Sequence, residues 1–214
     1  MSTMSERNKG QLQVLFPDAY ILYENVDLDH DKVLKELSKL DYKDLGDQPV
    51  YMTTSVKIFK KSKLLNEVKH SLETLATHAV SQMLGYDRTL RLINLWATKT
   101  PPKCGSGTHN HRNFWYTCVY YPHGSHADEF AIKFTTSKHQ DRLSVPVRSY
   151  NPFNSSDWTQ LVKKGDVLIF PGNIFHQILS NKTNDFRFSV AATFLPAGDI
   201  GINDGTINFD KIGG

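Results

Sequence analysis

Three histidines are the residues of this chain best suited to binding a metal ion. His109 and His111 are two positions apart, so their side chains point to the same side if the segment is an extended strand. His176 lies far downstream and can join this pair only if the chain folds back as a sheet. Imidazole is a suitable ligand for iron, zinc, copper and nickel. The pattern predicts one metal site, against the alternative of three ordinary loop and core histidines.

Arg187 is the second feature that predicts a binding site. It lies in an aromatic run that reads as a strand, where alternation places it on the same face as Ser189. If that face is the inner one, the buried guanidinium requires an anion, and its planar fork suits a carboxylate. The alternative is an ordinary ion pair with Asp185 or Asp166. A metal ion beside an organic acid is the chemistry that these residues indicate together.

The elements that must position these residues fall into two halves. Amphipathic patterns predict helices at 31–40 and 62–84, with Asp29 and Ser62 as caps and Gly85 as the end of the second. After Gly85, β-branched and aromatic runs predict strands at 91–98, 114–121, 130–136, 143–147, 166–170 and 186–195. Helices followed by strands favour an α+β fold, mainly β, whose β half forms a sandwich or barrel.

Composition limits the classes of protein and partner. The chain has 214 residues and a formal charge of +3, which favours one domain and argues against nucleic acid as a partner. Residues 1–10 are expected to form a flexible tail without an apolar signal, and 11–214 a single domain. No apolar run is long enough to cross a membrane. The chain has two cysteines, Cys104 and Cys118, which are too few to predict a disulfide framework. The expected location is therefore the cytoplasm, or the cytoplasm of the host if the source is a virus.

Residues 91–196 resemble the iron(II)- and 2-oxoglutarate-dependent oxygenases. More narrowly, they are similar to small, prolyl-hydroxylase-like members found in marine bacteria and their phages. That group often has a strand ending in two tyrosines and a Phe-Pro pair before the distal histidine. The features that carry the resemblance are His109-x-His111, Trp115 to Tyr121, Gly165 to Pro171, His176 and Arg187-x-Ser189.

The resemblance implies a fold and a set of roles. The fold is a double-stranded β-helix, a cupin-like jelly roll with a core at about 88–197 and supporting N-terminal helices. His109 is then the first iron(II) ligand and His176 the distal one. Arg187 binds the far carboxylate of 2-oxoglutarate and Ser189 supports it, while O2 is the second cosubstrate.

One position departs from the family's pattern. The family places an aspartate or glutamate where this chain has His111. Three interpretations follow: His111 binds the metal, a carboxylate such as Asp128 or Glu129 completes the site, or the site is degenerate and inactive. The first is favoured because the position and the reach of the side chain already match.

The implied reaction is hydroxylation of a small molecule or of a protein residue, with proline as one example. Asn94, Trp96, Asn113 and Tyr120 are candidates for the pocket wall, although three of them could equally be ordinary strand or core residues. A three-histidine dioxygenase of the cupin type without an oxoacid, and a non-catalytic structural or binding jelly roll, are the alternatives. Substrate specificity is expected to lie in loops, whose residue patterns do not identify a substrate. The sequence does not predict the oligomeric state.

Overall fold

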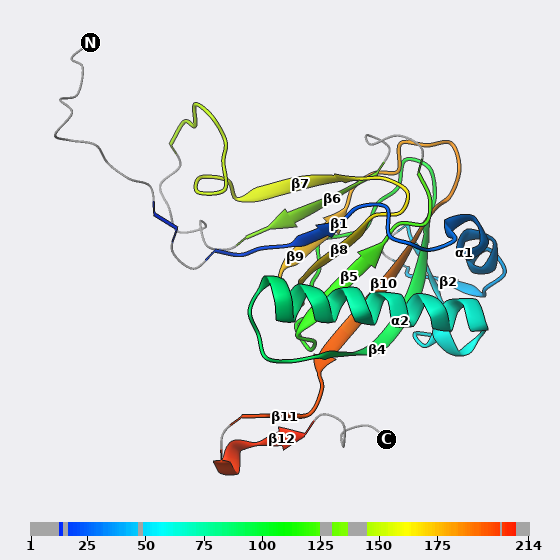
Figure 1. The fold of residues 1–214 in the computed structure, drawn as a ribbon. Helices are drawn as coiled ribbons and strands as arrows, with labels where there is room; N and C mark the ends of the chain where they lie inside the picture. Colours follow the sequence, from blue (N-terminus) through cyan, green and yellow to red (C-terminus); the bar gives the residue numbers. More distant parts are fainter. Residues whose placement is uncertain are drawn as a thin grey trace.

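The computed structural model describes residues 13–14, 17–46, 49–124, 130–136, 145–201 and 203–208. The expected tail at 1–10 and the alternative ligands Asp128 and Glu129 lie outside these residues. Two antiparallel sheets face one another and form the body of the molecule (Figure 1). The arrangement confirms the predicted fold class, mainly β with supporting helices.

The larger sheet has seven strands in the order β1-β8-β5-β10-β4-β3-β2. Their bounds are Ile21–Tyr23 for β1, Val167–Pro171 for β8, Tyr116–Tyr120 for β5, Arg187–Pro196 for β10, Leu90–Thr100 for β4, Tyr51–Thr53 for β3 and Tyr42–Asp44 for β2. The smaller sheet has the order β7-β6-β9, with bounds Asp157–Val162, Phe130–Thr135 and Phe175–Ile178. Strands that neighbour in space are far apart in sequence, which is the connectivity of a jelly roll.

β10 is the central strand of the larger sheet and has two different faces. Val190, Ala192 and Phe194 point to one side and join the core beneath the helices. The alternate residues Arg187 and Ser189 point to the other side, into the space between the sheets. The strand is paired on both edges, with β4 and β5, so its register is well determined. Alternation on β10 thus separates the packing side chains from those available to a site.

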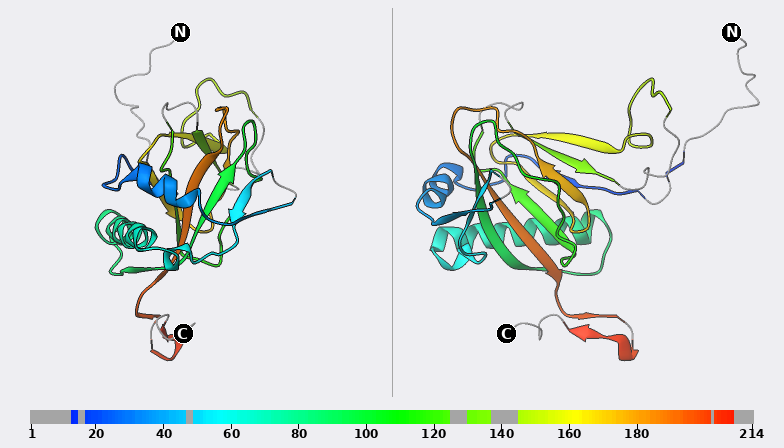
Figure 2. Two further views of the ribbon diagram at one scale, coloured as in Figure 1. Left: turned by 90° about the vertical axis from the view of Figure 1, so that its right-hand side faces the viewer. Right: turned by 180° about the vertical axis from the view of Figure 1, so that it is seen from behind.

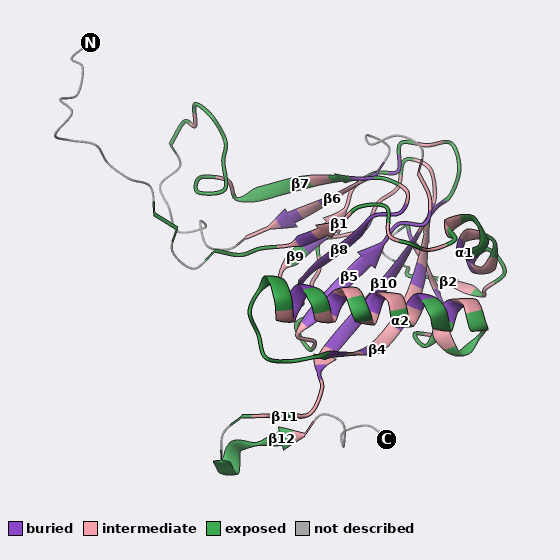
Figure 3. Cartoon of the chain, in the orientation of Figure 1, coloured by how far each residue is buried: buried purple, intermediate pink, exposed green. Residues whose placement is uncertain are grey.

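Two helices cover the outer face of the larger sheet (Figures 1 and 2). α1 spans His30–Leu37, and the side chain of Asp29 accepts a hydrogen bond from Lys32 N at its start. α2 spans Lys63–His78, and Ser62 Oγ accepts from Leu65 N at 3.3 Å. Both predicted caps are confirmed, and burial is confined to the sheet-facing stripe of α2 (Figure 3).

The end of α2 differs from the prediction in detail. A π-helical turn, η3 (Ala79–Met83), follows the α-helix, and Gly85 then adopts a φ of +77°. A left-handed conformation of this kind is costly for residues with a Cβ, so glycine ends the helix as expected. A single 3-10 turn, η2 (Ile58–Lys60), precedes α2.

A second core fills the space between the two sheets. It contains buried apolar residues from β5, β6, β7 and β8 or their ends: Val119, Tyr121, Phe130, Ile132, Phe134, Val162, Leu168 and Phe170. This core closes one part of the interior, and the polar side chains of β10 and β9 face the remainder. The interior is thus a mixed environment in which polar groups are removed from water.

Some strands were predicted wrongly or missed. Residues 145–147 form no strand, and 143–144 lie outside the described residues. β7 was missed because its apolar residues, Trp158, Leu161 and Val162, do not alternate with polar ones, and two of the three are exposed. β9 was missed because it is short and directly follows the Pro171-Gly172 break. Both strands belong to the smaller sheet, which carries His176.

A small C-terminal hairpin stands apart from the body in every ribbon view (Figure 2). It consists of β11 (Asp199–Ile200), the 3-10 turn η4 (Asn203–Gly205) and β12 (Ile207–Asn208). Among the described residues, no helix is long and apolar enough to cross a membrane.

Candidate metal centre and anion pocket

His109 and His176 are held side by side by their own backbones. His109 N donates to His176 O at 2.9 Å, and His176 N donates to His109 O at 2.8 Å. Two antiparallel residues joined in this way carry their side chains on the same face of the sheet. The two ring centroids lie 4.4 Å apart. The segment at His109 therefore acts as a short extension of the smaller sheet beyond β9.

The protonation of these two rings follows from their hydrogen bonds. His109 Nδ1 lies 2.9 Å from Gly107 O. His176 Nδ1 lies 3.1 Å from Ile174 O. Because a carbonyl oxygen only accepts, each Nδ1 carries a proton and donates it, which makes Nε2 the nitrogen of each ring that is placed to bind a metal. Fixing a histidine through one nitrogen while the other stays free is the arrangement found in metal-binding imidazoles.

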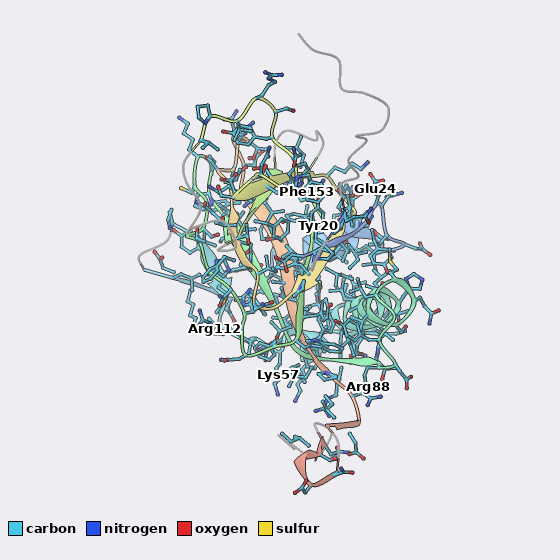
Figure 4. The ribbon with its side chains drawn as sticks, turned by 90° about the vertical axis from the view of Figure 1, so that its left-hand side faces the viewer. Tyr20, Glu24, Lys57, Arg88, Arg112 and Phe153 are labelled. Carbon is cyan, nitrogen blue, oxygen red and sulfur yellow. The ribbon has the colours of Figure 1, made fainter. Side chains whose placement is uncertain are left out.

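His111 is positioned by the turn that leads into β5. Its amide N donates to Gly172 O at 2.7 Å, and Phe114 N donates to His111 O at 2.9 Å. A Cβ at position 172 would overlap the carbonyl oxygen of Phe114 and lie 2.7 Å from that of His111, so only glycine fits. The ring of Trp96 lies edge-on, with its centroid 5.5 Å from that of the His111 ring. Arg112, which follows His111 in the chain, is exposed and projects from the surface (Figure 4).

The three imidazoles form one cluster. One nitrogen from each of His109, His111 and His176 lies within 4.8 Å of the others. Burial, with a smaller contribution from nearby His109, lowers the pKa of His111 to about 4 and that of His176 to about 3. Both rings are neutral at pH 7 and free to bind a cation. No aspartate, glutamate or cysteine of the described part of the chain joins the cluster.

Arg187 is almost fully buried, with 1% of its surface exposed. Its Nη1 donates to Leu179 O at 3.4 Å, and the guanidinium lies 5.1 Å from the centre of the Phe130 ring. Its Nε and Nη2 are buried and have no hydrogen-bond partner. Burial lowers the pKa of this guanidinium because the charged form loses its hydration.

The predicted protein partners of Arg187 do not pair with it. Within the described ranges no carboxylate forms an ion pair with its guanidinium. Asp185 is exposed, and Asp166 Oδ2 instead accepts from Lys163 N at 3.0 Å. Two buried donors of a cationic group without an acceptor are costly, so the pocket calls for an anion from outside the chain.

Tyr121 is a site residue that the sequence analysis missed. Its hydroxyl is buried without a hydrogen-bond partner. Burial raises the pKa of this phenol, and the positive charge of nearby Arg187 opposes that shift. Strand alternation was the available signal, because Tyr121 points to the opposite face from Tyr120. Ser189, on the same face as Arg187, lies with its Oγ 2.7 Å from Thr98 Oγ1.

The four predicted pocket residues lie in different places. Asn94 and Trp96 pair with Thr193 and Ala191 of β10, so they face the interior between the sheets. Asn113 is exposed in the turn after His111.

Tyr120 points the other way. It packs in the core beneath the helices, and its hydroxyl lies 2.6 Å from His30 Nδ1. The prediction of Tyr120 as a pocket residue does not fit this position, and Tyr121 takes its place.

Tyr20 closes part of the open edge between the sheets. It precedes β1, its ring stacks on Phe134 at a centroid distance of 5.0 Å, and its hydroxyl donates to Gln160 Oε1 at 2.6 Å (Figure 4). Phe134 contacts Phe170, whose ring lies 4.8 Å from that of His176. This row of aromatic rings shields one side of the histidine cluster from water.

A protein family and several solved structures relate the chain to known proteins. Residues 94–193 match the model of a family described as "Putative 2OG-Fe(II) oxygenase". No curated protein matches the chain significantly. Among solved structures, the alpha ketoglutarate dependent epimerase SnoN of nogalamycin biosynthesis has a TM-score of 0.63 at 15% identity, over 85% of this chain and 80% of that one.

Two further structures share the fold. HygX from Streptomyces hygroscopicus, with nickel and 2-oxoglutarate bound, has a TM-score of 0.61 at 12% identity, over 84% of this chain and 83% of that one. A prolyl-4-hydroxylase from Pseudomonas putida has a TM-score of 0.56 at 11% identity, over 83% of this chain and 92% of that one. At these identities the likeness is one of fold.

The family match and the geometry concern the same part of the molecule. The matched segment runs from Asn94 on β4 to Thr193 on β10 and contains the three clustered histidines and Arg187. The imidazole nitrogens suit a metal ion, and the two guanidinium nitrogens without a partner suit a carboxylate beside it. Over residues 94–193, just under half of its length, the chain thus matches the 2OG-Fe(II) oxygenase family model, and this segment carries the whole candidate site.

Proposed function

We propose that this protein is an iron(II)- and 2-oxoglutarate-dependent dioxygenase in which His109, His111 and His176 hold the iron. One observation carries the proposal: a cluster of three imidazoles and a buried Arg187, whose Nε and Nη2 have no hydrogen-bond partner, lie in the interior between the sheets. A metal alone would account for the histidines and leave the guanidinium unexplained. A dicarboxylate that reaches from the metal to Arg187 accounts for both.

The residues around the cosubstrate have distinct roles in this proposal. Arg187 and Tyr121 donate hydrogen bonds to the far carboxylate, and Ser189 supports it through its hydroxyl. Orientation of the oxoacid by these fixed donors removes rotational freedom before the reaction. Bound iron(II) supplies activation of O2, coupled to oxidative decarboxylation of the oxoacid.

The chain's own contribution to substrate chemistry is positioning and exclusion of water. Trp96 and Asn94 face the interior next to His111 and form the wall against which a substrate lies. The aromatic row at Phe134 and Phe170 keeps water from the other side.

We propose hydroxylation of a small molecule or of a residue in a protein as the reaction. The structures with the same fold support this range: one HygX structure holds hygromycin B, and another neighbour is a prolyl-4-hydroxylase. Proline is one candidate acceptor. Both cysteines of the chain are free thiols, which supports the cytoplasm as the proposed location.

The test is release of succinate from labelled 2-oxoglutarate in the presence of iron(II), ascorbate and candidate substrates. We expect turnover by the wild-type protein and none above background by His176→Ala. Equal succinate release by both proteins would show that the histidine cluster is not the reaction centre.

A three-histidine dioxygenase of the cupin type is the second candidate, and the all-imidazole ligand set is the observation that favours it. It needs no oxoacid and leaves Arg187 without a ligand. Arg187→Leu separates the two: it weakens oxoacid binding roughly 100-fold under the first proposal and leaves turnover unchanged under the second. Absence of stoichiometric metal after anaerobic loading with iron(II) would instead favour a non-catalytic jelly roll.

A further inference from the structure

The interior at the histidine cluster contains more positive than negative charge. The three imidazoles contribute no negative charge, and the described part of the chain places no carboxylate among them. Arg187 adds a buried positive charge that no described carboxylate compensates. A divalent cation that enters this interior meets imidazole ligands, which carry no negative charge, and a guanidinium that repels it.

The energetic consequence follows from burial. His176 is 2% exposed and Arg187 1% exposed, so water screens their charges poorly. In a site with an aspartate ligand, the protein itself would neutralise part of the metal's charge. Here His111 occupies the third ligand position, and that neutralisation must come from a bound anion.

We propose that the metal ion and the oxoacid bind this site cooperatively, because the dicarboxylate supplies the negative charge that the three-histidine ligand set lacks, and that His111 is the residue responsible. The inference rests on the proposed function. It adds that the site holds its metal weakly until 2-oxoglutarate is present. The oxoacid thus acts as a cosubstrate and as a condition for loading the metal.

Reciprocity makes the proposal quantitative. If 2-oxoglutarate raises the affinity for the metal by some factor, the metal must raise the affinity for 2-oxoglutarate by the same factor. We expect this factor to be at least about 10 in the wild type, within the range usual for coupled sites. His111→Asp should tighten metal binding without oxoacid about tenfold and reduce the coupling to a few-fold, because the side chain then carries the missing charge.

The experiment measures binding and needs no turnover. Mn(II) is titrated into the metal-free protein by calorimetry, with and without saturating 2-oxoglutarate. Quenching of tryptophan fluorescence provides a second signal, since Trp96 lies 5.5 Å from the His111 ring. Glutarate replaces 2-oxoglutarate as a control that keeps the two carboxylates and the chain length but lacks the 2-oxo group. The reverse titration, 2-oxoglutarate with and without Mn(II), checks reciprocity.

Three variants complete the design. His111→Asp tests the charge at the metal. Arg187→Leu removes the repelling cation, so it should bind Mn(II) somewhat more tightly alone and should require a roughly 100-fold higher concentration of 2-oxoglutarate for the same coupling. The double variant Asp128→Asn with Glu129→Gln should behave as wild type. Thermal unfolding of each variant identifies any that fails to fold, and the Arg187→Leu result stands independently of His111→Asp.

The outcomes separate this inference from the proposed function. If Mn(II) and 2-oxoglutarate both bind but neither affects the other, cooperativity is refuted and the proposed function stands. If the Asp128/Glu129 double variant loses Mn(II) binding as His176→Ala does, a carboxylate completes the site and the role of His111 is refuted. If Mn(II) binds under no condition, the proposed function fails and this inference fails with it.

Discussion

The backbones of His109 and His176 are joined by two reciprocal hydrogen bonds, of 2.9 Å and 2.8 Å, so the two rings share one face of the smaller sheet. Residues 67 positions apart (176 − 109) are thereby brought into ring contact, with centroids 4.4 Å apart. The pairing does not depend on either side chain. Substitution of one ring should therefore remove a ligand and keep the local backbone.

Substitution of a clustered histidine should abolish metal binding without unfolding the protein. We expect His176→Ala to weaken Mn(II) binding at least roughly 100-fold, because one of three ligands is lost. Calorimetry measures the affinity and circular dichroism the fold. His70→Ala is the matched control, since His70 is exposed on α2, and it should bind as wild type does. Unchanged binding by His176→Ala would exclude the cluster as the metal site.

Removal of the guanidinium should affect the oxoacid. Arg187→Leu is expected to weaken 2-oxoglutarate binding roughly 100-fold, about 3 kcal/mol, because charge-assisted hydrogen bonds to the carboxylate are lost. Arg187→Lys should recover only part of this affinity, since an ammonium lacks the planar fork. Titration of 2-oxoglutarate in the presence of Mn(II) measures both. Wild-type affinity in Arg187→Leu would show that the anion binds elsewhere.

Tyr120 and Tyr121 are adjacent and point to opposite faces of the larger sheet, so their phenylalanine variants form a matched pair. Tyr121→Phe should weaken 2-oxoglutarate binding roughly tenfold, because one buried donor is removed. Tyr120→Phe should leave that affinity unchanged and lower the free energy of unfolding by about 1 kcal/mol, since it removes the hydrogen bond to His30. The same oxoacid titration and urea unfolding measure the two effects. A loss of oxoacid affinity in Tyr120→Phe alone would reverse the assignment of the two faces.

Gly172 should be intolerant of any side chain. Gly172→Ala brings a Cβ against the carbonyl oxygens of Phe114 and His111, so the turn that carries His111 must move. We expect lower thermal stability and weaker Mn(II) binding. Gly205→Ala is the control, because nothing lies within 4 Å of a Cβ there. If Gly172→Ala binds Mn(II) like wild type, the position of His111 does not depend on this contact.

The two free thiols should differ in reactivity. Cys118 is fully buried, and burial raises the pKa of its thiol, so the reactive thiolate is scarce. Cys104 is partly exposed. Iodoacetamide at neutral pH should modify Cys104 in the native protein and Cys118 only after unfolding, as mass spectrometry of the peptides would show. Rapid native modification of Cys118 would contradict the packing of β5.

The sequence by itself identified the elements whose signals are local. The caps Asp29 and Ser62 and the left-handed Gly85 appear where predicted, because capping and backbone conformation depend on a few neighbouring residues. The central strands were predicted for the same reason, since buried faces impose alternation. The exposed strand β7 and the short strand β9 were missed, because pairing with β6 rather than residue pattern makes them strands.

For the site, the sequence determined which residue types were available, and the resemblance assigned their roles. It could not show which of two adjacent tyrosines faces the anion, because that depends on the register of β5 between β8 and β10. It could not show that Nε and Nη2 of Arg187 lack a hydrogen-bond partner, since this is a property of everything packed around the guanidinium. Long-range sheet pairing alone decides these points, because it sets side-chain faces and burial between segments that share no local signal.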